Sequence, residues 1–209
     1  MILLNEIRAL AKKYEQQLSK QIHNRTIEMQ NDDTSHHLIY RVLGISHQEG
    51  ELIDLYQNKG RFLYKYAGAF LEEAAFMCIK YAYPDTHKVK IPNTLGVRPK
   101  TFEIDALVNE QFAFEIKWRD ATTDGDHITK EHTRLNVIHQ AGFKPIRLMF
   151  YYPNRTQAQK IQETLCTLYV GLNGEYYYAD SAWHFIHQFT GIDLLTILQT
   201  IASEKQNAV

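Results

Sequence analysis

Apolar and polar residues alternate along two neighbouring segments in the middle of the chain, residues 102–108 and 112–118. In both segments every even-numbered position is apolar. Side chains on a β-strand point to opposite faces at successive residues. Each segment is therefore predicted to be a strand with one apolar face and one face that carries charge. The charged residues at the odd-numbered positions are Glu103, Asp105, Glu115 and Lys117.

The loop between the two segments determines how they pair as a hairpin. A three-residue loop, Asn109–Gln111, keeps the apolar faces together and sets Val108 opposite Phe112, whereas a slip of one residue would turn every side chain to the wrong face. In this register Asp105 lies directly opposite Glu115. Like charges at facing positions are destabilising, and a hard cation such as Mg²⁺, which takes oxygen ligands, would offset the repulsion. The register therefore predicts a divalent-cation site between the two carboxylates.

Helical spacing of apolar residues, together with chain breakers, outlines the rest of the fold. Residues 24–58 are polar and are predicted to be irregular, apart from a short helix at about 38–43. Asp126 is a predicted N-cap, and Asn173–Gly174 is a predicted turn. The predicted helices span residues 3–22, 59–83, 127–140, 156–169 and 181–201, and the remaining strands span residues 87–91 and 144–152. This order predicts an α/β fold with a mixed central β-sheet flanked by helices (αβββαβ) and with helical N- and C-terminal additions.

Composition favours one globular domain. With 209 residues, 44% of them hydrophobic and 22% charged, the chain can bury a substantial core. We expect a single domain over residues 1–209, with its core at about 60–152 and helical elaborations at 1–58 and 153–209. The net charge of -1 argues only weakly against nucleic-acid binding, because a local basic patch can attract the phosphate backbone. No apolar run suits a membrane span or a signal peptide, so a cytoplasmic protein is expected.

The spacing of three of the charged residues matches a known motif. Asp105, Glu115 and Lys117 form the layout D-x(9)-E-x-K on two adjacent predicted strands, with a helix before them and a helix after them. This layout resembles the PD-(D/E)xK phosphodiesterase superfamily, and within it the type II restriction endonucleases, over residues 68–152. The chain departs from the motif at one position, since Ile104 stands where the motif has proline.

The resemblance implies a role for each of these residues. Asp105 and Glu115 would coordinate Mg²⁺ together with the backbone carbonyl of Ile116. Lys117 would orient or deprotonate the attacking water. These roles agree with the chemistry, because phosphodiester hydrolysis needs a nucleophile at neutral pH and stabilisation of charge on the phosphate, and a bound metal supplies both.

The helix before the hairpin is expected to add a further acidic residue to the site. Superfamily members often carry an acidic residue four positions after a glycine there, which selects Glu72, after Gly68, as a catalytic residue. Glu73 is the adjacent alternative and would point about 100° away around the helix. Glu103 is acidic too, and we expect it to pair with Lys117 or to face solvent.

Polar residues directly after the motif are the predicted DNA contacts. They follow the catalytic strand, where DNA would lie against the site, although an ordinary loop and helix cap would have a similar composition. Arginine and lysine there could contact phosphates or guanine edges, and Asp124 could accept from cytosine amino groups, bind metal or cap the helix. Arg155 follows a tyrosine-rich strand end and is a further candidate phosphate contact, with edge packing as the alternative for that segment. The predicted DNA-binding residues are Arg119, Thr122, Thr123, Asp124, His127, Lys130, Arg134 and Arg155.

The chain's 10 histidines do not predict a zinc site. None of the candidates has a convincing set of partner ligands at metal-binding spacing. Mg²⁺, which the facing carboxylates suit and the resemblance implies, is the metal cofactor that we expect. The histidines considered are His36, His37, His127, His132 and His139.

These features together predict a Mg²⁺-dependent, sequence-specific endonuclease of double-stranded DNA, that is, a type II restriction enzyme. A palindromic target calls for two active sites related by a two-fold axis, so a homodimer is expected. Two alternatives stay open. One is a repair or junction-resolving nuclease that recognises DNA structure, and the other is a catalytically silent nucleic-acid-binding protein with the same fold.

Overall fold

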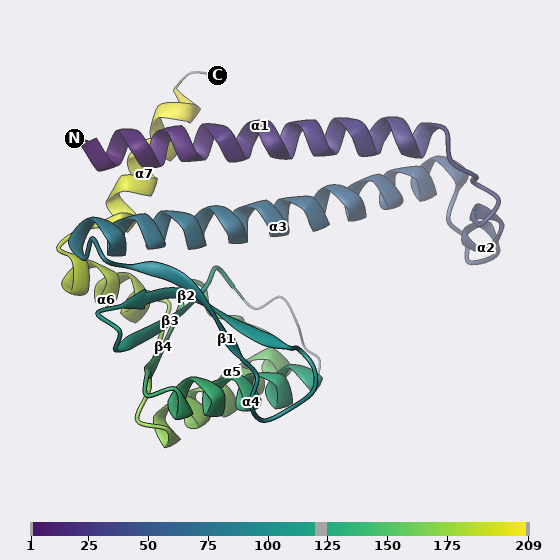
Figure 1. Ribbon diagram of the computed structural model, residues 1–209. Coiled ribbons are helices and arrows are strands. Elements are labelled where there is room, and N and C mark those ends of the chain that lie inside the picture. Colours follow the sequence, from purple (N-terminus) through teal and green to yellow (C-terminus); the bar gives the residue numbers. More distant parts are fainter. Residues whose placement is uncertain (1, 120–124, 208–209) are drawn as a thin grey trace. The chain divides into compact units, whose positions relative to one another are not determined.

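The computed structural model describes residues 2–119 and 125–207, with side chains described from residue 128 onward in the second range. The chain divides into two compact units (Figure 1), residues 8–70 and residues 1–7 with 71–209. Each unit is described by itself. That both act together as a single nuclease domain over residues 1–209 stays a prediction.

The smaller unit, residues 8–70, is helical. Its two long helices, α1 and α3, run side by side (Figure 1), and the ring of Tyr14 packs edge-on against the rings of Tyr66 and Phe70 at centroid distances of 6.2 Å and 6.0 Å. A short helix, α2, lies in the connection between them. The helices are α1 (Ile2–Gln30), α2 (His37–Val42) and α3 (His47–Ala82), of which α1 and α3 extend into the larger unit.

These helices are longer than the sequence pattern predicted. α1 continues past residue 22 to Gln30, and α3 begins at His47 instead of residue 59. The prediction of irregular structure over residues 24–58 is therefore wrong for most of that segment, although the short helix at about 38–43 is confirmed. Many residues of the segment are polar but good helix formers, such as glutamate, glutamine and arginine, so polarity alone does not mark a loop.

The larger unit is built on a five-stranded mixed sheet in the order β1-β2-β3-β4-β5. β1, β2 and β3 pair antiparallel, whereas β3, β4 and β5 pair parallel. The predicted α/β class with a mixed central sheet is confirmed. The strands are β1 (His87–Pro92), β2 (Thr101–Val108), β3 (Phe112–Lys117), β4 (Lys144–Met149) and β5 (Glu175–Tyr178).

Helices cover both faces of the sheet. On one face, Val137 and Ile138 of α4 belong to a buried apolar cluster that includes Ala113 of β3. Phe114, the next residue along β3, faces the opposite side, where its ring lies 6.2 Å from that of Phe185 in α6. β3 is thus covered on both sides. The helices of this part are α4 (Gly125–Gln140), α5 (Thr156–Gly171), α6 (Asp180–Thr190) and α7 (Leu194–Gln206).

β5 was not predicted from the sequence. It extends the sheet by pairing with β4, so that Ile146 lies opposite Glu175. The turn before it, Asn173–Gly174, was predicted. A Cβ on Gly174 would lie 2.6 Å from the carbonyl oxygen of Pro145, so the absence of a side chain lets the chain approach β4 closely enough to pair.

The helix predicted over residues 181–201 is two helices, α6 and α7. Gly191 follows α6 with a left-handed φ of 72°, a conformation that glycine adopts without steric cost and that commonly ends a helix. Asp193 then caps α7 by accepting the backbone N–H of Thr196 at 2.9 Å. A three-residue interruption of this kind leaves the apolar periodicity on either side almost intact.

Other element boundaries differ by a few residues. α4 begins at Gly125, so Asp126 lies within its first turn instead of at the predicted N-cap position. β4 ends at Met149 instead of residue 152, and β3 ends at Lys117 instead of residue 118. Among the described residues, no helix combines the length and the apolarity that crossing a membrane requires.

Candidate active site

β2 carries a β-bulge where it passes β1. Val89 of β1 lies opposite Ile104, but His87 lies opposite Leu107, so two residues of β2, Asp105 and Ala106, face the single residue between them on β1. A bulge of this kind shifts the alternation of side chains and re-aims the residue at the bulge. The bulge therefore sets the direction of the Asp105 side chain.

Because of the bulge, the side chains of β2 are distributed over the two faces differently from the prediction. The alternating pattern placed Leu107 on the charged face, yet Leu107 belongs to the same buried cluster as Phe102 and Ile104, beneath α4. Ala113 of β3 belongs to this cluster as well, and by alternation Glu115 lies on the same side of β3. The charged face of the hairpin is thus partly covered by α4 instead of facing solvent throughout.

The hairpin register near the loop is as predicted. Val108 lies opposite Phe112, and the strand pairing extends to Ala106 opposite Phe114. Beyond that point, the carboxylate of Asp105 accepts the backbone N–H of Ile116 at 2.8 Å through Oδ2. The predicted pairing of Asp105 with Glu115 falls just outside the paired segment, because the Asp105 side chain takes the place of a backbone acceptor there.

The three motif residues come together at this point. Nζ of Lys117 lies 2.5 Å from Oε1 of Glu115 and 3.8 Å from Oδ2 of Asp105. Asp105 and Glu115 are each 7% exposed, whereas about a third of the Lys117 side chain is accessible. A pocket opens over them, and it is lined by Pro99, Phe102, Glu103, Asp105, Glu115, Lys117, Lys130, Glu131 and Arg134.

The two carboxylates have opposite electrostatic environments. Burial and the negative charge of Glu115 raise the pKa of Asp105 to about 7, with Lys117 opposing the shift. Burial by itself would also raise the pKa of Glu115, but the positive charges of Arg134 and Lys117 outweigh it and hold that pKa below its usual range. Glu115 is therefore ionised at neutral pH, and Asp105 titrates near neutrality.

Lys117 is held as a cation by its neighbours. Burial favours the neutral amine, but the charges of Glu115 and Asp105 outweigh this effect and raise the pKa of Lys117. Its ammonium group can therefore donate hydrogen bonds into the pocket.

A network of buried ion pairs contacts Glu115 from the protein interior. Arg134 of α4 forms an ion pair with Oε2 of Glu115 and donates to the carbonyl oxygen of Glu103 at 2.9 Å. Oε1 of Glu131 accepts from Arg147 at 3.0 Å and lies 3.4 Å from Arg134. Arg147 itself lies beside Glu115 on the neighbouring strand. The network fixes the position of the Glu115 carboxylate through contacts with two other elements.

Sequence reasoning missed Glu131 and Arg147. Arg147 is 2% exposed in a strand otherwise buried through apolar residues, and among the described atoms its Nε has no hydrogen-bond acceptor. A single arginine inside an apolar strand was the available signal, because a buried charge requires a partner. Glu131, which also accepts from the hydroxyl of Tyr169 at 2.8 Å, is that partner.

Glu72 lies close enough to Asp105 to influence its pKa, and its carboxylate is paired with a lysine. Oε1 of Glu72 accepts from Nζ of Lys88 at 2.5 Å. Burial would lower the pKa of Lys88, but the charges of Glu72 and Asp105 outweigh it and raise that pKa. The charge of Glu72 in turn contributes to raising the pKa of Asp105. Lys88 is a second cation close to the site that sequence reasoning did not single out.

Glu103 has a different partner from the one expected. Its carboxylate lies 3.4 Å from Nζ of Lys90 on β1 and is exposed. The predicted pairing with Lys117 is wrong, and the alternative, that Glu103 faces solvent, is confirmed. The bulge accounts for the difference. Regular alternation would place Glu103 and Asp105 on the same face, and the bulge turns Asp105 in another direction.

The predicted DNA-contacting residues fall into four groups. Lys130 is exposed on the rim of the pocket. Arg134 is 7% exposed and bound to carboxylates, so its guanidinium does not face solvent as a DNA contact would. Arg119 and Arg155 line a second pocket together with Trp118 and Tyr151. Thr122, Thr123, Asp124 and the side chain of His127 lie outside the described residues.

A comparison with known protein families gives a match over most of the chain. The family model for ApaLI-like restriction endonucleases matches residues 1–203. This range includes both compact units and every residue that lines the pocket over Asp105. No curated protein and no solved structure matches the chain.

Proposed function

The chain belongs to the ApaLI-like restriction endonuclease family, and on that premise we propose that it is a Mg²⁺-dependent type II restriction enzyme that cleaves double-stranded DNA at a short sequence. The family accounts for nuclease activity and for binding of DNA. The metal, the catalytic residues and the assembly are the proposal. One observation carries it: Asp105, Glu115 and Lys117 meet in one pocket, with Lys117 within 3.8 Å of both carboxylates.

The donor set suits Mg²⁺. Asp105 and Glu115 offer carboxylate oxygens, the ligand type that this ion prefers. Burial and, after it, repulsion by Glu115 raise the pKa of Asp105, and a divalent cation between the two carboxylates would offset both by favouring the ionised form. The backbone carbonyl of Ile116 is a third candidate ligand. Because the N–H and C=O of a residue in an antiparallel strand point to the same neighbour, and the N–H of Ile116 faces Asp105, its carbonyl faces that side as well.

Bound Mg²⁺ would supply Lewis-acid stabilisation of the phosphate and a water of lowered pKa. Lys117 contacts both carboxylates, and its raised pKa keeps it a cation. Of the two roles that the resemblance implied, its ammonium group therefore suits orienting the attacking water, because taking a proton would need the neutral amine. Glu72 completes the acidic surroundings through its charge, with Lys88 as its counterion. Arg134 holds the Glu115 carboxylate in place from the protein side.

The DNA side of the proposal rests on the cations that line the two pockets. Lys130 lies on its rim, and Arg119 and Arg155 lie together in the second pocket. Such side chains bind phosphates without reading sequence. We keep Thr122, Thr123 and Asp124, which follow β3 in the sequence, and His127 of α4 as predicted contacts.

We also propose a homodimer, because two-fold symmetry suits a palindromic target. Exposed apolar side chains on and beside α2 support an interface: Leu38, Ile39, Val42 and Leu43 are each more than half exposed, and such patches mark protein contacts. Sedimentation of the pure protein at micromolar concentration tests this point, and a single monomeric species would contradict it. The cytoplasm stays the predicted location.

The decisive experiment compares two matched substitutions on β2. Wild-type protein is expected to cut a sequenced plasmid into discrete fragments with Mg²⁺ and to leave it intact with EDTA. Asp105→Asn removes a metal ligand but keeps an acceptor for the N–H of Ile116, so cleavage should fall about 1,000-fold or more, while DNA is still retarded in gels. Glu103→Gln, an exposed change two residues away, should leave cleavage unchanged.

The same experiment separates the alternatives. A structure-specific nuclease would cut branched or damaged DNA but give no discrete fragments from an intact duplex. A silent DNA-binding protein would retard DNA and cut none with either Mg²⁺ or Mn²⁺. Equal cleavage by Asp105→Asn and wild-type protein would refute the assigned site.

A further inference from the structure

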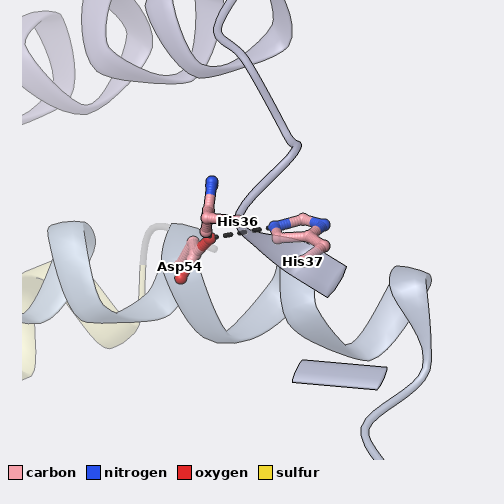
Figure 2. A group of neighbouring side chains, drawn as sticks. All are labelled: His36, His37 and Asp54. Carbon is pink, nitrogen blue, oxygen red and sulfur yellow. Dashed lines mark hydrogen bonds and ion pairs between the residues drawn. The ribbon is translucent and has the colours of Figure 1, made fainter. Parts of the chain in front are cut away.

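A second cluster of metal-binding side chains lies in the smaller unit, where α2 begins beside α3. Figure 2 shows that the rings of His36 and His37 both point toward the carboxylate of Asp54. Nε2 of His36 lies 3.1 Å, and Nε2 of His37 lies 3.2 Å, from the same oxygen, Oδ2 of Asp54. One potential ligand atom from each residue lies within 4.8 Å of the others.

The spacing of these atoms suits a tetrahedral ion. Zinc binds imidazole nitrogen and carboxylate oxygen at about 2.0–2.1 Å, so two ligands of one tetrahedral ion stand about 3.3 Å apart. Both distances from His nitrogen to Asp54 oxygen are close to this value. The third pair, the two histidine nitrogens, lies within 4.8 Å and would approach to about 3.3 Å around a bound ion.

Two of the three side chains have a further polar partner that orients them. Nδ1 of His37 lies 2.9 Å from Nδ1 of His47, and the hydroxyl of Tyr40 donates to Oδ1 of Asp54 at 2.9 Å. Metal-bound histidines and carboxylates characteristically have such outer partners, which set the tautomer and direction of each ligand.

The surroundings leave room for a cation. His37 is 3% exposed, whereas about half of the His36 side chain is accessible, so one side of the cluster is closed and the other opens into a pocket. Asp32, Asp33 and Glu51 line the same pocket and make it negative. The open side can hold a water as a fourth ligand.

We propose that His36, His37 and Asp54 bind a Zn²⁺ ion that fastens the beginning of α2 to α3. The sequence did not predict this site, because Asp54 stands 17 residues after His37 and no short metal-binding motif results. The proposal does not depend on the nuclease activity. Without a metal, both rings would instead have to donate their Nε2–H groups to one carboxylate oxygen, and that hydrogen-bonded cluster is the alternative.

The test is a zinc titration of the full chain after removal of metals with a chelator. All proteins carry Asp105→Asn, so that the nuclease carboxylates do not contribute to binding. Calorimetry, with metal content determined by mass spectrometry, is expected to find one tightly bound Zn²⁺ per chain. Because ion binding stabilises the folded state, the melting temperature should rise with Zn²⁺ concentration.

Two ligand variants and one control decide the outcome. His36→Ala changes an accessible side chain and Asp54→Asn keeps the acceptor for Tyr40, so both should fold, and each should weaken zinc binding about 100-fold or more. His23→Ala, an exposed histidine on α1 of the same unit, should bind zinc as the parent does. Tyr40→Phe, which removes only the outer partner, should weaken binding about 10-fold.

Cobalt gives an independent readout of the ligands. Co²⁺ in the same site should show the visible absorption of a four-coordinate ion, and that absorption should vanish in His36→Ala. Absence of zinc binding in the parent, or equal binding in the parent, His36→Ala and Asp54→Asn, would overturn the proposal and leave the hydrogen-bonded cluster. Loss of DNA cleavage in any of these proteins bears on neither result, since Asp105→Asn is present throughout.

Discussion

Glu115 on β3 is ion-paired with Arg134 on α4, and both side chains are less than a tenth exposed. The sequence analysis had assigned Arg134 to DNA contact, as one of the polar residues that follow the motif. In the structure, the helix after the hairpin supplies the counterion for a predicted metal ligand instead. α4 therefore supports the site from the protein side, and only its more exposed residues remain available to DNA.

Arg134→Met should destabilise the protein by about 3–5 kcal/mol, because it leaves Glu115 and Glu131 buried without their shared cation. Urea unfolding followed by circular dichroism measures the change. Lys130→Met, an exposed change one turn earlier on the same helix, should alter stability by about 0.5 kcal/mol or less. If both variants unfold at the wild-type midpoint, the buried pair does not support the fold as we describe.

Stability measured in EDTA should carry a pH-dependent contribution from Asp105. Its pKa is raised from 3.8 to about 7 on folding, so between these values the native state keeps a proton that the unfolded chain has lost. Stability from this group is therefore full below pH 4 and declines as pH rises toward 7. A tenfold change in proton affinity corresponds to about 1.4 kcal/mol. A decline of roughly 1–4 kcal/mol should appear as the difference between wild type and Asp105→Asn.

Denaturant titrations at several pH values between 4 and 8 would reveal this difference. The comparison with Asp105→Asn cancels the contributions of other groups, including Glu115, whose lowered pKa acts in the opposite direction. Glu103→Gln serves as the control, because an exposed carboxylate on the same strand should leave the pH profile like that of wild type. A constant difference across this range would show that Asp105 is ionised in the folded protein throughout.

Lys117→Met should reduce cleavage about 100-fold or more while changing the Kd for DNA by no more than about 3-fold, because its amino group acts at the reacting phosphate and water. Single-turnover cleavage and gel retardation separate the two effects. Lys90→Met removes an exposed lysine of the same sheet that pairs with Glu103, and it should leave cleavage near the wild-type rate. A parallel loss of DNA affinity and cleavage in Lys117→Met would mean that Lys117 serves binding instead of chemistry.

Arg155→Ala should weaken DNA binding in a salt-dependent way. If Arg155 contacts a phosphate, its removal should reduce the slope of log K against log salt concentration by about 1 and weaken binding similarly on all sequences. Fluorescence anisotropy with cognate and unrelated duplexes measures both quantities. Lys160→Ala, a change one turn into α5, is the control. An unchanged slope in Arg155→Ala would assign that residue to local packing.

Much of the sheet could be predicted because the alternation of apolar and polar residues along a strand is a property of neighbouring residues. The alternating pattern located β2 and β3 to within one residue at each end, and the short loop set their register near Val108. β5 was missed because four residues, most of them tyrosine, give almost no periodic signal. It becomes a strand only by pairing with β4, which lies more than twenty residues earlier in the chain.

The composition of the site was only partly predictable, for a similar reason. Nothing in the letters marks the bulge at Asp105, since it arises from how β2 pairs with β1. Glu131 and Arg147 become partners because two separate elements bring them within 3.0 Å. His36 and Asp54 likewise meet only where α2 comes beside α3. In each case the partner is distant in sequence, so no spacing rule identifies it.

The sequence by itself determined the α/β class, the hairpin and the D-x(9)-E-x-K spacing of Asp105, Glu115 and Lys117, because side-chain alternation and a short loop are properties of neighbouring residues. The tertiary structure alone decided which charges neutralise one another. It paired Arg134 with Glu115, Lys88 with Glu72 and Lys90 with Glu103. Electrostatic interactions depend on distance in space and on burial, and both exist only once helices and strands have packed.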